Sequence, residues 1–395
     1  MTHILVECPD LIASVKIGVL DCLKIFEQKG LCSVRFVKTL MIKGNDIRWC
    51  DILITVRGCE SLTYSIVKKA RKNGRLIVYY LDDDLLNVPI GPACPHEYYE
   101  SVIRKNMTNI LGNAKILWGV NPLICEKYLK YTDSGRWLDN KVVMPLKSYH
   151  MNRSGDGKVR ILYAGSSSHQ DNVRSILAPA VKIIAERYRE KVEFVFVGVD
   201  SGINDMENVK HYSIFKDYND YRNFVENGRF SFGLAVVKTE EFYQCKYYNK
   251  FLEYTSIGCL GIYTDSKPYT YVVKDKINGI LCNNNQSDWY DAICFAIDHI
   301  DECSIMFEKA KEYVAEYHNT EFASKQLEHD FPELITYSAP EISRLNVISI
   351  NPKIFFFQSR VREILSYNGF FKGSLIIIFK GIKYVVNKFA GGKRC

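Results

Sequence analysis

Short β-branched or aromatic runs alternate with helix-length segments through most of this chain. The first runs are residues 3–8 (HILVEC) and 32–37 (CSVRFV), and amphipathic stretches such as 11–29 and 61–73 lie between such runs. Apolar strands linked by helices are typical of a parallel sheet that helices cover on both faces. Further strands are expected at residues 51–56, 75–80, 115–120 and 141–146.

A polar segment with two glycines, residues 147–158 (KSYHMNRSGDGK), divides this pattern. The alternation starts again with runs at 159–165, 192–198, 230–237 and 259–264. A chain of 395 residues is also long for a single core. We therefore expect an α/β protein with two Rossmann-like βαβ lobes, residues 1–148 and 158–337, and a ligand cleft between them. No GxGxxG follows any strand, so no dinucleotide cofactor is expected.

The charge of the chain is unevenly distributed. The net charge is +7, but residues 352–395 hold nine lysines and arginines against one glutamate, a net of +8. Residues 1–351 hold 43 basic and 44 acidic residues, a net of −1. A nucleic-acid-binding body would carry its basic patch on the fold itself, so no nucleic-acid partner is expected.

Residues 352–395 are expected to form a basic amphipathic tail. Its apolar residues recur at helical spacing among lysines, which is typical of a helix on an anionic membrane surface. The alternative is a helix docked on the protein's own body. Without a signal peptide or an apolar run of about 20 residues, the membrane interpretation predicts a cytoplasmic protein, peripheral on the inner face of the cytoplasmic membrane. The apolar positions are Leu375, Ile378, Ile382, Val385, Val386 and Phe389.

Residues 247–265 (YYNKFLEYTSIGCLGIYTD) are the most informative stretch for function. Asn249 is expected to cap a helix, which places Lys250 in its first turn and Glu253 one turn further on the same face. A helix N-terminus with an adjacent lysine suits a diphosphate, and a carboxylate one turn away can accept hydrogen bonds from both ribose hydroxyls. Alone, the two residues could equally form a surface ion pair.

The motif KFLEYTSIG at 250–258 resembles the KxxEYxxxG element of bacterial nucleotide-sugar glycosyltransferases with the two-lobed GT-B fold, the group 1 or family 4-like enzymes of surface polysaccharide biosynthesis. Residues 161–172 (ILYAGSSSHQDN) look like that family's loop opening the second lobe, and 278–297 like its late loop and helix. Order and spacing match over roughly 160–300, and the first lobe is compatible.

The resemblance implies a site and a reaction. In that family the glutamate matching Glu253 binds the donor ribose, and the lysine matching Lys250 lies near the diphosphate. A loop after the first strand of the second lobe faces the donor phosphates and sugar, and a Gly/Ser loop offers donors to phosphate. The residues of this loop are Gly165, Ser166, Ser167 and His169.

The reaction implied by the resemblance is sugar transfer from a nucleotide-diphosphate sugar to a polysaccharide or lipid-linked oligosaccharide, retaining, metal-independent and without a cofactor. His169 and Lys250 are the expected catalytic residues, although an ordinary loop histidine fits position 169 equally well. Two rivals stay open, namely a GT-B-like nucleotide-sugar epimerase and a non-catalytic sugar- or partner-binding protein.

The chain departs from the family at two places. Cys245 stands where many relatives have a second glutamate, and Glu240 and Glu241 are out of register. A glycine–glycine–proline–glutamate segment is replaced by DSKPYTY at 265–271. Both departures leave the identity of the donor sugar open.

Three aspartates, Asp82, Asp83 and Asp84, follow the expected strand at 75–80. Their spacing fits the Asp-x-Asp metal site of single-lobed GT-A enzymes. A second lobe with its own phosphate-type loop, and the positive charge at Lys250, argue against a metal here. We expect an acceptor-side acidic loop that orients a hydroxyl. The equally open alternative is that Asp84 or a neighbour caps the next segment and the other aspartates are solvated.

Overall fold

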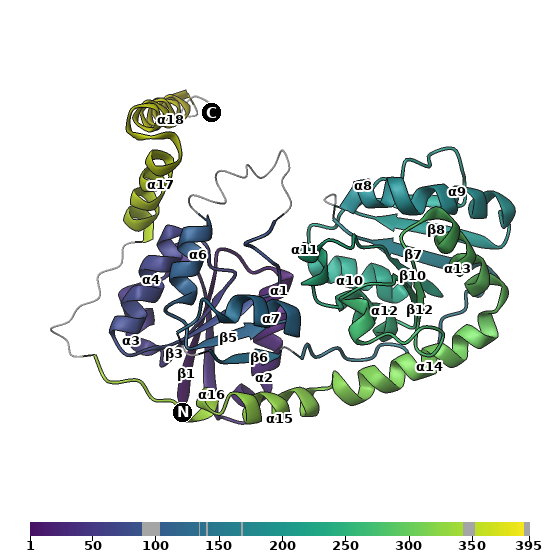
Figure 1. Cartoon of the computed structure of the whole chain (residues 1–395), viewed down its shortest axis with the longest axis horizontal. Helices are drawn as coiled ribbons and strands as arrows, with labels where there is room; N and C mark the ends of the chain where they lie inside the picture. Colours follow the sequence, from purple (N-terminus) through teal and green to yellow (C-terminus); the bar gives the residue numbers. More distant parts are fainter. Residues whose placement is uncertain (89–102, 134, 140, 167–168, 343–351, 391–395) are drawn as a thin grey trace. The chain divides into compact units, whose positions relative to one another are not determined.

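The computed structural model describes residues 1–88, 103–133, 135–139, 141–166, 169–342 and 352–390 (Figure 1). The chain divides into two compact units, Met1–Asn140 with Gln326–Cys395 (unit 1) and Lys141–Lys325 (unit 2). Each unit contains one six-stranded sheet in which every described pair of strands is parallel. The expected α/β class with two Rossmann-like lobes is confirmed.

The sheet of unit 1 has the order β2-β1-β3-β4-β5-β6. Its two central strands β3 and β4 are buried at every position, which explains their unbroken apolar sequences. The strand expected at 141–146 is wrong, because the sixth strand lies at 137–139. Val142 and Met144 are buried, but their backbone N–H groups donate to Tyr247 and His318, outside any sheet. The strands are β1 (Thr2–Cys8), β2 (Cys32–Lys38), β3 (Ile52–Val56), β4 (Leu76–Leu81), β5 (Ile116–Gly119) and β6 (Trp137–Asp139).

The helices of unit 1 connect these strands. The helix expected at 11–29 consists of three successive helical segments, the middle one with π geometry. The helix after β5 begins behind Asn121, whose side chain accepts from the N–H of Ile124 at 2.9 Å. The described helices between the strands are α1 (Ala13–Val15), η1 (Lys16–Leu20), α2 (Asp21–Gln28), η2 (Thr39–Met41), α3 (Gly44–Trp49), α4 (Ser61–Lys72), α6 (Arg104–Leu111) and α7 (Pro122–Leu129).

After unit 2, residues 326–342 return to unit 1 through the end of α15 (Thr320–Asp330) and through α16 (Glu333–Thr336). Thr2 Oγ1 donates to Tyr337 O at 3.1 Å, and Ala339 N donates to Asp51 Oδ1 at 2.9 Å. The sequence pattern assigned residues up to 337 to the second lobe. The return segment carries no strand of either sheet, so the strand–helix alternation gives no sign of where it packs.

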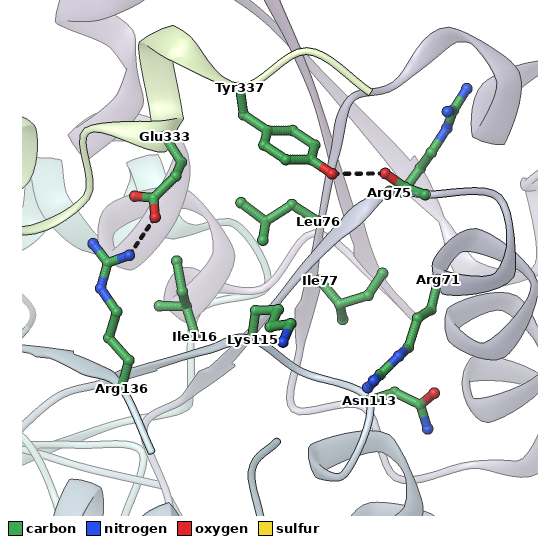
Figure 2. Close-up of a pocket in the computed structure, with 11 residues that line it drawn as sticks. Arg71, Arg75, Leu76, Ile77, Asn113, Lys115, Ile116, Arg136, Glu333 and Tyr337 are labelled. Carbon is green, nitrogen blue, oxygen red and sulfur yellow. Dashed lines mark hydrogen bonds and ion pairs between the residues drawn. The ribbon is translucent and has the colours of Figure 1, made fainter. Parts of the chain in front are cut away.

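A hollow of about 380 Å³ lies along this return segment (Figure 2). Arg136 forms an ion pair with Glu333, and Tyr337 donates to Gly74 O at 2.8 Å. Leu76 and Ile116, which also line the hollow, begin β4 and β5. The hollow therefore lies at the amino ends of these strands, whereas ligands of parallel sheets bind at the carboxyl ends. We interpret it as a junction between the return segment and the sheet of unit 1, and not as a ligand site.

The sheet of unit 2 has the order β12-β11-β10-β7-β8-β9. Its edge strand β9 was not expected from the sequence, because only Val209 of its four residues is buried. Buried side chains of β7, β8 and β10 and of the helices around them form one hydrophobic core. The strands are β7 (Val159–Ala164), β8 (Val192–Val197), β9 (Val209–Tyr212), β10 (Phe232–Ala235), β11 (Leu260–Thr264) and β12 (Ile280–Cys282).

The described helices of unit 2 cover the sheet and supply most of the candidate site. The helix expected near 172–189 again contains a π segment, and the helix expected at 249–257 ends one residue earlier than expected. The helices are α8 (Gln170–Asn172), η5 (Val173–Leu177), α9 (Ala178–Arg187), α10 (Tyr218–Asn227), α11 (Glu241–Gln244), α12 (Asn249–Ser256), η6 (Tyr269–Tyr271), α13 (Gln286–Asp298) and α14 (Ile300–Tyr317).

The basic tail forms two helices, α17 (Pro352–Asn368) and α18 (Phe370–Ala390). Helix α17 packs against α4 and η2 of unit 1, and Arg360 Nη2 lies 3.3 Å from Glu60 Oε1. Helix α18 packs against α17. Among the described residues, no helix has both the length and the hydropathy needed to cross a bilayer.

Candidate functional site

Helix α12 begins close to the carboxyl end of the unit 2 sheet. It packs against β10 and β11, and Tyr254 donates its hydroxyl hydrogen to Leu234 O of β10 at 2.8 Å. The expected cap at Asn249 is wrong, because the helix already includes Asn249 and Tyr248 occupies the cap position without a side-chain cap. Lys250 and Glu253 nevertheless lie in the first turns of α12, where the free N–H groups and the helix dipole favour anions.

Lys250 and Glu253 are in contact. Lys250 Nζ lies 2.5 Å from Glu253 Oε2. Glu253 is 7% exposed, so this is not the solvated surface ion pair that its spacing alone allowed. A buried carboxylate is costly unless other groups compensate it, which raises the question of what else surrounds Glu253.

Helix α10 provides the rest of the surroundings of Glu253. Lys250 Nζ lies 3.2 Å from the Tyr221 hydroxyl, which also hydrogen-bonds to Glu253. Arg222 Nη1 lies 4.0 Å from Glu253 Oε1, and this nitrogen is buried without a hydrogen bond. Arg222 uses its other nitrogens on Glu226, at 2.8 and 3.1 Å. Sequence reasoning missed Tyr221 and Arg222, because they lie on another helix about thirty residues earlier.

These partners keep Glu253 ionised. Burial alone would raise the pKa of Glu253, but the positive charge of Lys250, hydrogen bonds from Lys250 and Tyr221, and the charge of Arg222 outweigh it, so the pKa is lowered. The pKa of Tyr221 is raised well above its ordinary value by burial and by the neighbouring Glu253, so its hydroxyl stays protonated. The cluster thus presents one carboxylate as an acceptor and one ammonium group next to it.

The loop after β7 lies beside the end of β8. Gly165 N donates to Val197 O at 3.0 Å, and Gly198 has a φ of +77°. A Cβ atom on Gly198 would lie 2.2 Å from Gly165 O, so only glycine allows this close approach of two backbones. Gly165 is half-buried and Ser166 is exposed, whereas Ser167 lies outside the described residues.

His169 precedes α8, and its ring contacts Tyr243 of α11 at a centroid distance of 6.3 Å. Cys245, two residues after Tyr243, is fully buried. Glu240 and Glu241 are both exposed. The position that holds a second glutamate in many relatives is therefore an interior thiol in this chain.

The aspartate triplet of unit 1 is divided between two clusters. Asp82 and Asp83 follow β4, and both pair with Arg57, whose Nη2 lies 2.8 Å from Asp83 Oδ2. Arg57 itself has a φ of +54°, an uncommon conformation for a residue with a side chain. The side chains of Asp82 and Asp83 are only 12% and 16% exposed, so the expectation that they are solvated is wrong.

Asp84 is completely buried. Its Oδ2 lies 2.5 Å from Lys127 Nζ, and its Oδ1 accepts hydrogen bonds from the Tyr128 hydroxyl and from Asn87 Nδ2. The side chain of Asp84 thus binds residues of α7 and the turn that follows. Lys127, Tyr128 and Arg57 were missed, because nothing in their local sequence links them to the triplet.

Neither aspartate cluster resembles a set of metal ligands. In the described parts of the chain, no group of three or more His, Cys, Asp or Glu side chains is arranged to hold a metal ion. The cysteines of the described segments are free thiols, nearly all buried. The chemistry available at α12 is that of hydrogen-bond acceptance by a carboxylate and charge neutralisation by a lysine.

Comparisons with known proteins identify the fold of this chain. No family model matches the sequence, and no curated protein matches it. HepE from Anabaena, solved in complex with UDP and glucose, matches with a TM-score of 0.59 and 11% identity over 84% of this chain and 100% of its own. Sucrose-phosphate synthase from Thermosynechococcus elongatus matches with a TM-score of 0.61 and 11% identity over 85% and 100%. This chain has the GT-B fold.

A third GT-B match is the lipopolysaccharide outer core galactosyltransferase WaaB, in its apo form, with a TM-score of 0.55 and 12% identity over 85% of this chain and 99% of its own. The GT-B expectation from the sequence is thus confirmed for the fold. At such low identity a GT-B likeness says nothing of substrate, so function has to be argued from the site.

Proposed function

We propose that this GT-B protein is a glycosyltransferase that moves a sugar from a nucleotide-diphosphate sugar to a polysaccharide or lipid-linked oligosaccharide acceptor. The observation that carries the proposal is the contact of Lys250 with the buried Glu253 in the first turns of α12. Two of the matched proteins add support, because HepE was solved with UDP and glucose, and WaaB is a galactosyltransferase.

In this proposal Glu253 accepts hydrogen bonds from the two ribose hydroxyls of the donor. Lys250 and the free N–H groups of α12 bind the diphosphate. Lys250 then exchanges part of its contact with Glu253 for the donor phosphates, and Arg222 supplies positive charge to Glu253 in its place. Gly165, Ser166 and Ser167 add hydrogen-bond donors to the phosphates.

The proposed reaction is a substitution at the anomeric carbon of the donor sugar. An acceptor hydroxyl oxygen forms a bond to this carbon, and the bond from the carbon to the β-phosphate oxygen breaks. The hydroxyl proton passes to that departing oxygen, so the nucleoside diphosphate leaves with both bonding electrons and the proton, and the configuration is retained. Lys250 stabilises the leaving diphosphate without a metal, and His169 contacts the donor near the reacting carbon.

The acceptor side of the proposal rests on unit 1. Arg57 with Asp82 and Asp83 forms a charged group directly after β3 and β4, where polar side chains could orient an acceptor hydroxyl. Asp84 contributes by holding the following turn rather than by contact. We also propose that the protein works at the inner face of the cytoplasmic membrane, where a lipid-linked acceptor is found.

A thermal-shift screen against nucleoside diphosphates tests the donor site, because a ligand of the native state raises the melting temperature. Glu253→Gln and Lys250→Ala should each weaken binding of the preferred nucleotide by about 1–3 kcal/mol. The matched controls are Glu312→Gln and Lys309→Ala, an exposed pair at the same spacing on α14, 2.8 Å apart. The proposed site is wrong if the α12 variants bind the nucleotide as tightly as the controls.

A further inference from the structure

Helix α18 exposes large apolar side chains on one face. Phe371, Leu375, Ile378 and Phe379 are 85%, 58%, 56% and 69% exposed. Their spacing of four, three and one residues places them on one stripe of the helix, which we call the α18 stripe. Contiguous exposed apolar side chains of this size are uncommon on a soluble surface and mark a binding face.

The opposite face of α18 packs on α17. Gly373 is buried, and a Cβ atom there would lie 3.0 Å from Ile364 O of α17, so the two helices cross closely at this point. Ile376 and Ile377, on either side of Gly373 around the helix, are half-buried. The packing of the two tail helices therefore uses the face away from the α18 stripe and leaves that stripe uncovered.

Helix α17 attaches the tail to unit 1. It packs against α4 and η2, and Arg360 pairs with Glu60 at the start of α4. The two interpretations of the tail, docking on the body and docking on a membrane, thus apply to different helices. One helix holds the tail to unit 1, and the other presents the α18 stripe.

Charge identifies what covers the stripe. The tail carries a net charge of +8 while the rest of the chain carries −1, and Lys372 and Lys380 of α18 are exposed. Lys372 borders the stripe, whereas Lys380 lies toward the opposite side of the helix. An apolar stripe on a positively charged helix complements a lipid surface, where apolar side chains enter the headgroup region and lysines meet anionic lipids. A second copy of the chain would instead bring two strongly positive tails together.

We propose that the α18 stripe is the membrane-docking surface of this protein, that it binds anionic phospholipid, and that α17 attaches it to unit 1. This inference specifies how the proposed membrane location is reached. It is independent of the proposed chemistry, so vesicle binding and donor binding can fail separately.

The test is co-sedimentation of the full chain with vesicles of phosphatidylcholine, with and without phosphatidylglycerol. The full chain should bind the anionic vesicles, and high salt should release part of it, because screening removes only the electrostatic share. Ile378→Glu with Phe379→Glu should reduce binding roughly tenfold or more. Phe371→Glu should also reduce binding, and its matched control is Ile305→Glu, which places one glutamate at a 68% exposed isoleucine on α14.

Nucleotide binding and thermal unfolding show that each variant is folded, and Phe371→Glu, at the start of α18, replaces the double variant if the latter unfolds. Three results would overturn the proposal. They are no preference for anionic vesicles, equal binding by the stripe variants and the control, and a dimer in solution that the stripe variants dissociate. The last result would mean that a second copy covers the α18 stripe.

Discussion

The Glu253 cluster shows how single residues define the candidate site. The one-turn spacing of Lys250 and Glu253 was sufficient to predict their contact, because residues three apart on a helix are neighbours. Tyr221 and Arg222 could not be predicted in the same way. Their position follows from the packing of α10 against α12, and no local spacing in the sequence records it.

Arg222→Gln tests whether α10 supports the site. Removing this positive charge should raise the pKa of Glu253, whose folded value is lowered partly by Arg222. The ribose contact needs the ionised carboxylate. As the pH is lowered, nucleotide affinity should therefore begin to decline at a higher pH in the variant than in the parent. Calorimetric titrations across the acidic range would measure this shift. Arg174→Gln, which changes an exposed arginine paired with Asp200, is the control. Identical pH profiles in all three proteins would exclude a role of Arg222.

Asp84 is predicted to stabilise unit 1 rather than contact a substrate. Asp84→Asn removes the buried counter-charge of the partly exposed Lys127 ammonium, and breaking a buried ion pair costs about 3–5 kcal/mol. Urea denaturation should show a loss of this size. Asp83→Asn should cost less, because Arg57 keeps its bonds to Asp82. A variant at Asp84 that is as stable as the parent but inactive would instead place this residue in contact with the acceptor.

At the scale of elements, most of the parallel strands could be predicted and a few could not. Runs buried on both faces, such as β3 and β4, are unmistakable in the sequence. The edge strand β9 carries too little apolar surface to be recognised. Residues 141–146 have the same apolar composition as a strand, but the N–H groups of Val142 and Met144 donate to Tyr247 and His318 in place of a neighbouring strand. The apolar composition of a segment indicates that it is buried, but not which element buries it.

The return segment predicts where the chain can be shortened. A chain that ends after Ile342 keeps the hydrogen bonds of Tyr337, Ala339 and Pro340 to unit 1, whereas a chain that ends after Lys325 loses them. The chain that ends after Lys325 also loses Phe331 and Leu334, both completely buried. We expect the longer form to unfold cooperatively and bind nucleotide without binding vesicles. The shorter form should lose at least about 4 kcal/mol of stability. Equal denaturation midpoints would contradict this.

The junction between α14 and residues 142–144 predicts a pH dependence. His318 is buried at the end of α14, where its Nδ1–H donates to Val142 O at 2.9 Å, and burial lowers its pKa from 6.5 to about 4. The unfolded chain therefore binds a proton first as the pH falls. Stability from this group is complete above pH 6.5 and declines by about 1.4 kcal/mol per pH unit down to about 4.

Substituting His318 isolates this contribution. His318→Leu should be less stable at neutral pH, because Val142 O loses its donor, yet its stability should fall less steeply than that of the parent between pH 6.5 and 4. His150→Leu, at an exposed histidine, should keep the slope of the parent. Urea denaturation at several pH values measures these slopes. A slope unchanged by His318→Leu would show that the histidine is not held neutral.

The whole molecule combines a GT-B fold, a proposed donor site in unit 2 and a charged tail with two proposed roles. The sequence predicted the two lobes and the uneven charge, because both are properties of long segments. It did not predict that α17 docks on unit 1 while the α18 stripe stays exposed, since both helices mix apolar and basic residues and neither sequence records its packing partner. The GT-B fold alone leaves transferase, epimerase and binding protein as candidates, and the α12 site suits the nucleotide-sugar that a transferase or an epimerase would bind.

The central claim is that the α12 site supports sugar transfer from a nucleotide-sugar. The most direct measurement is the release of nucleoside diphosphate from a panel of nucleotide-sugars, in excess EDTA, by the parent, Lys250→Ala and Lys309→Ala. We predict release from at least one donor by the parent and by Lys309→Ala, and a rate roughly 10²–10³-fold lower in Lys250→Ala. No release from any donor by a parent that binds nucleotide, or an undiminished rate in Lys250→Ala, would contradict the account.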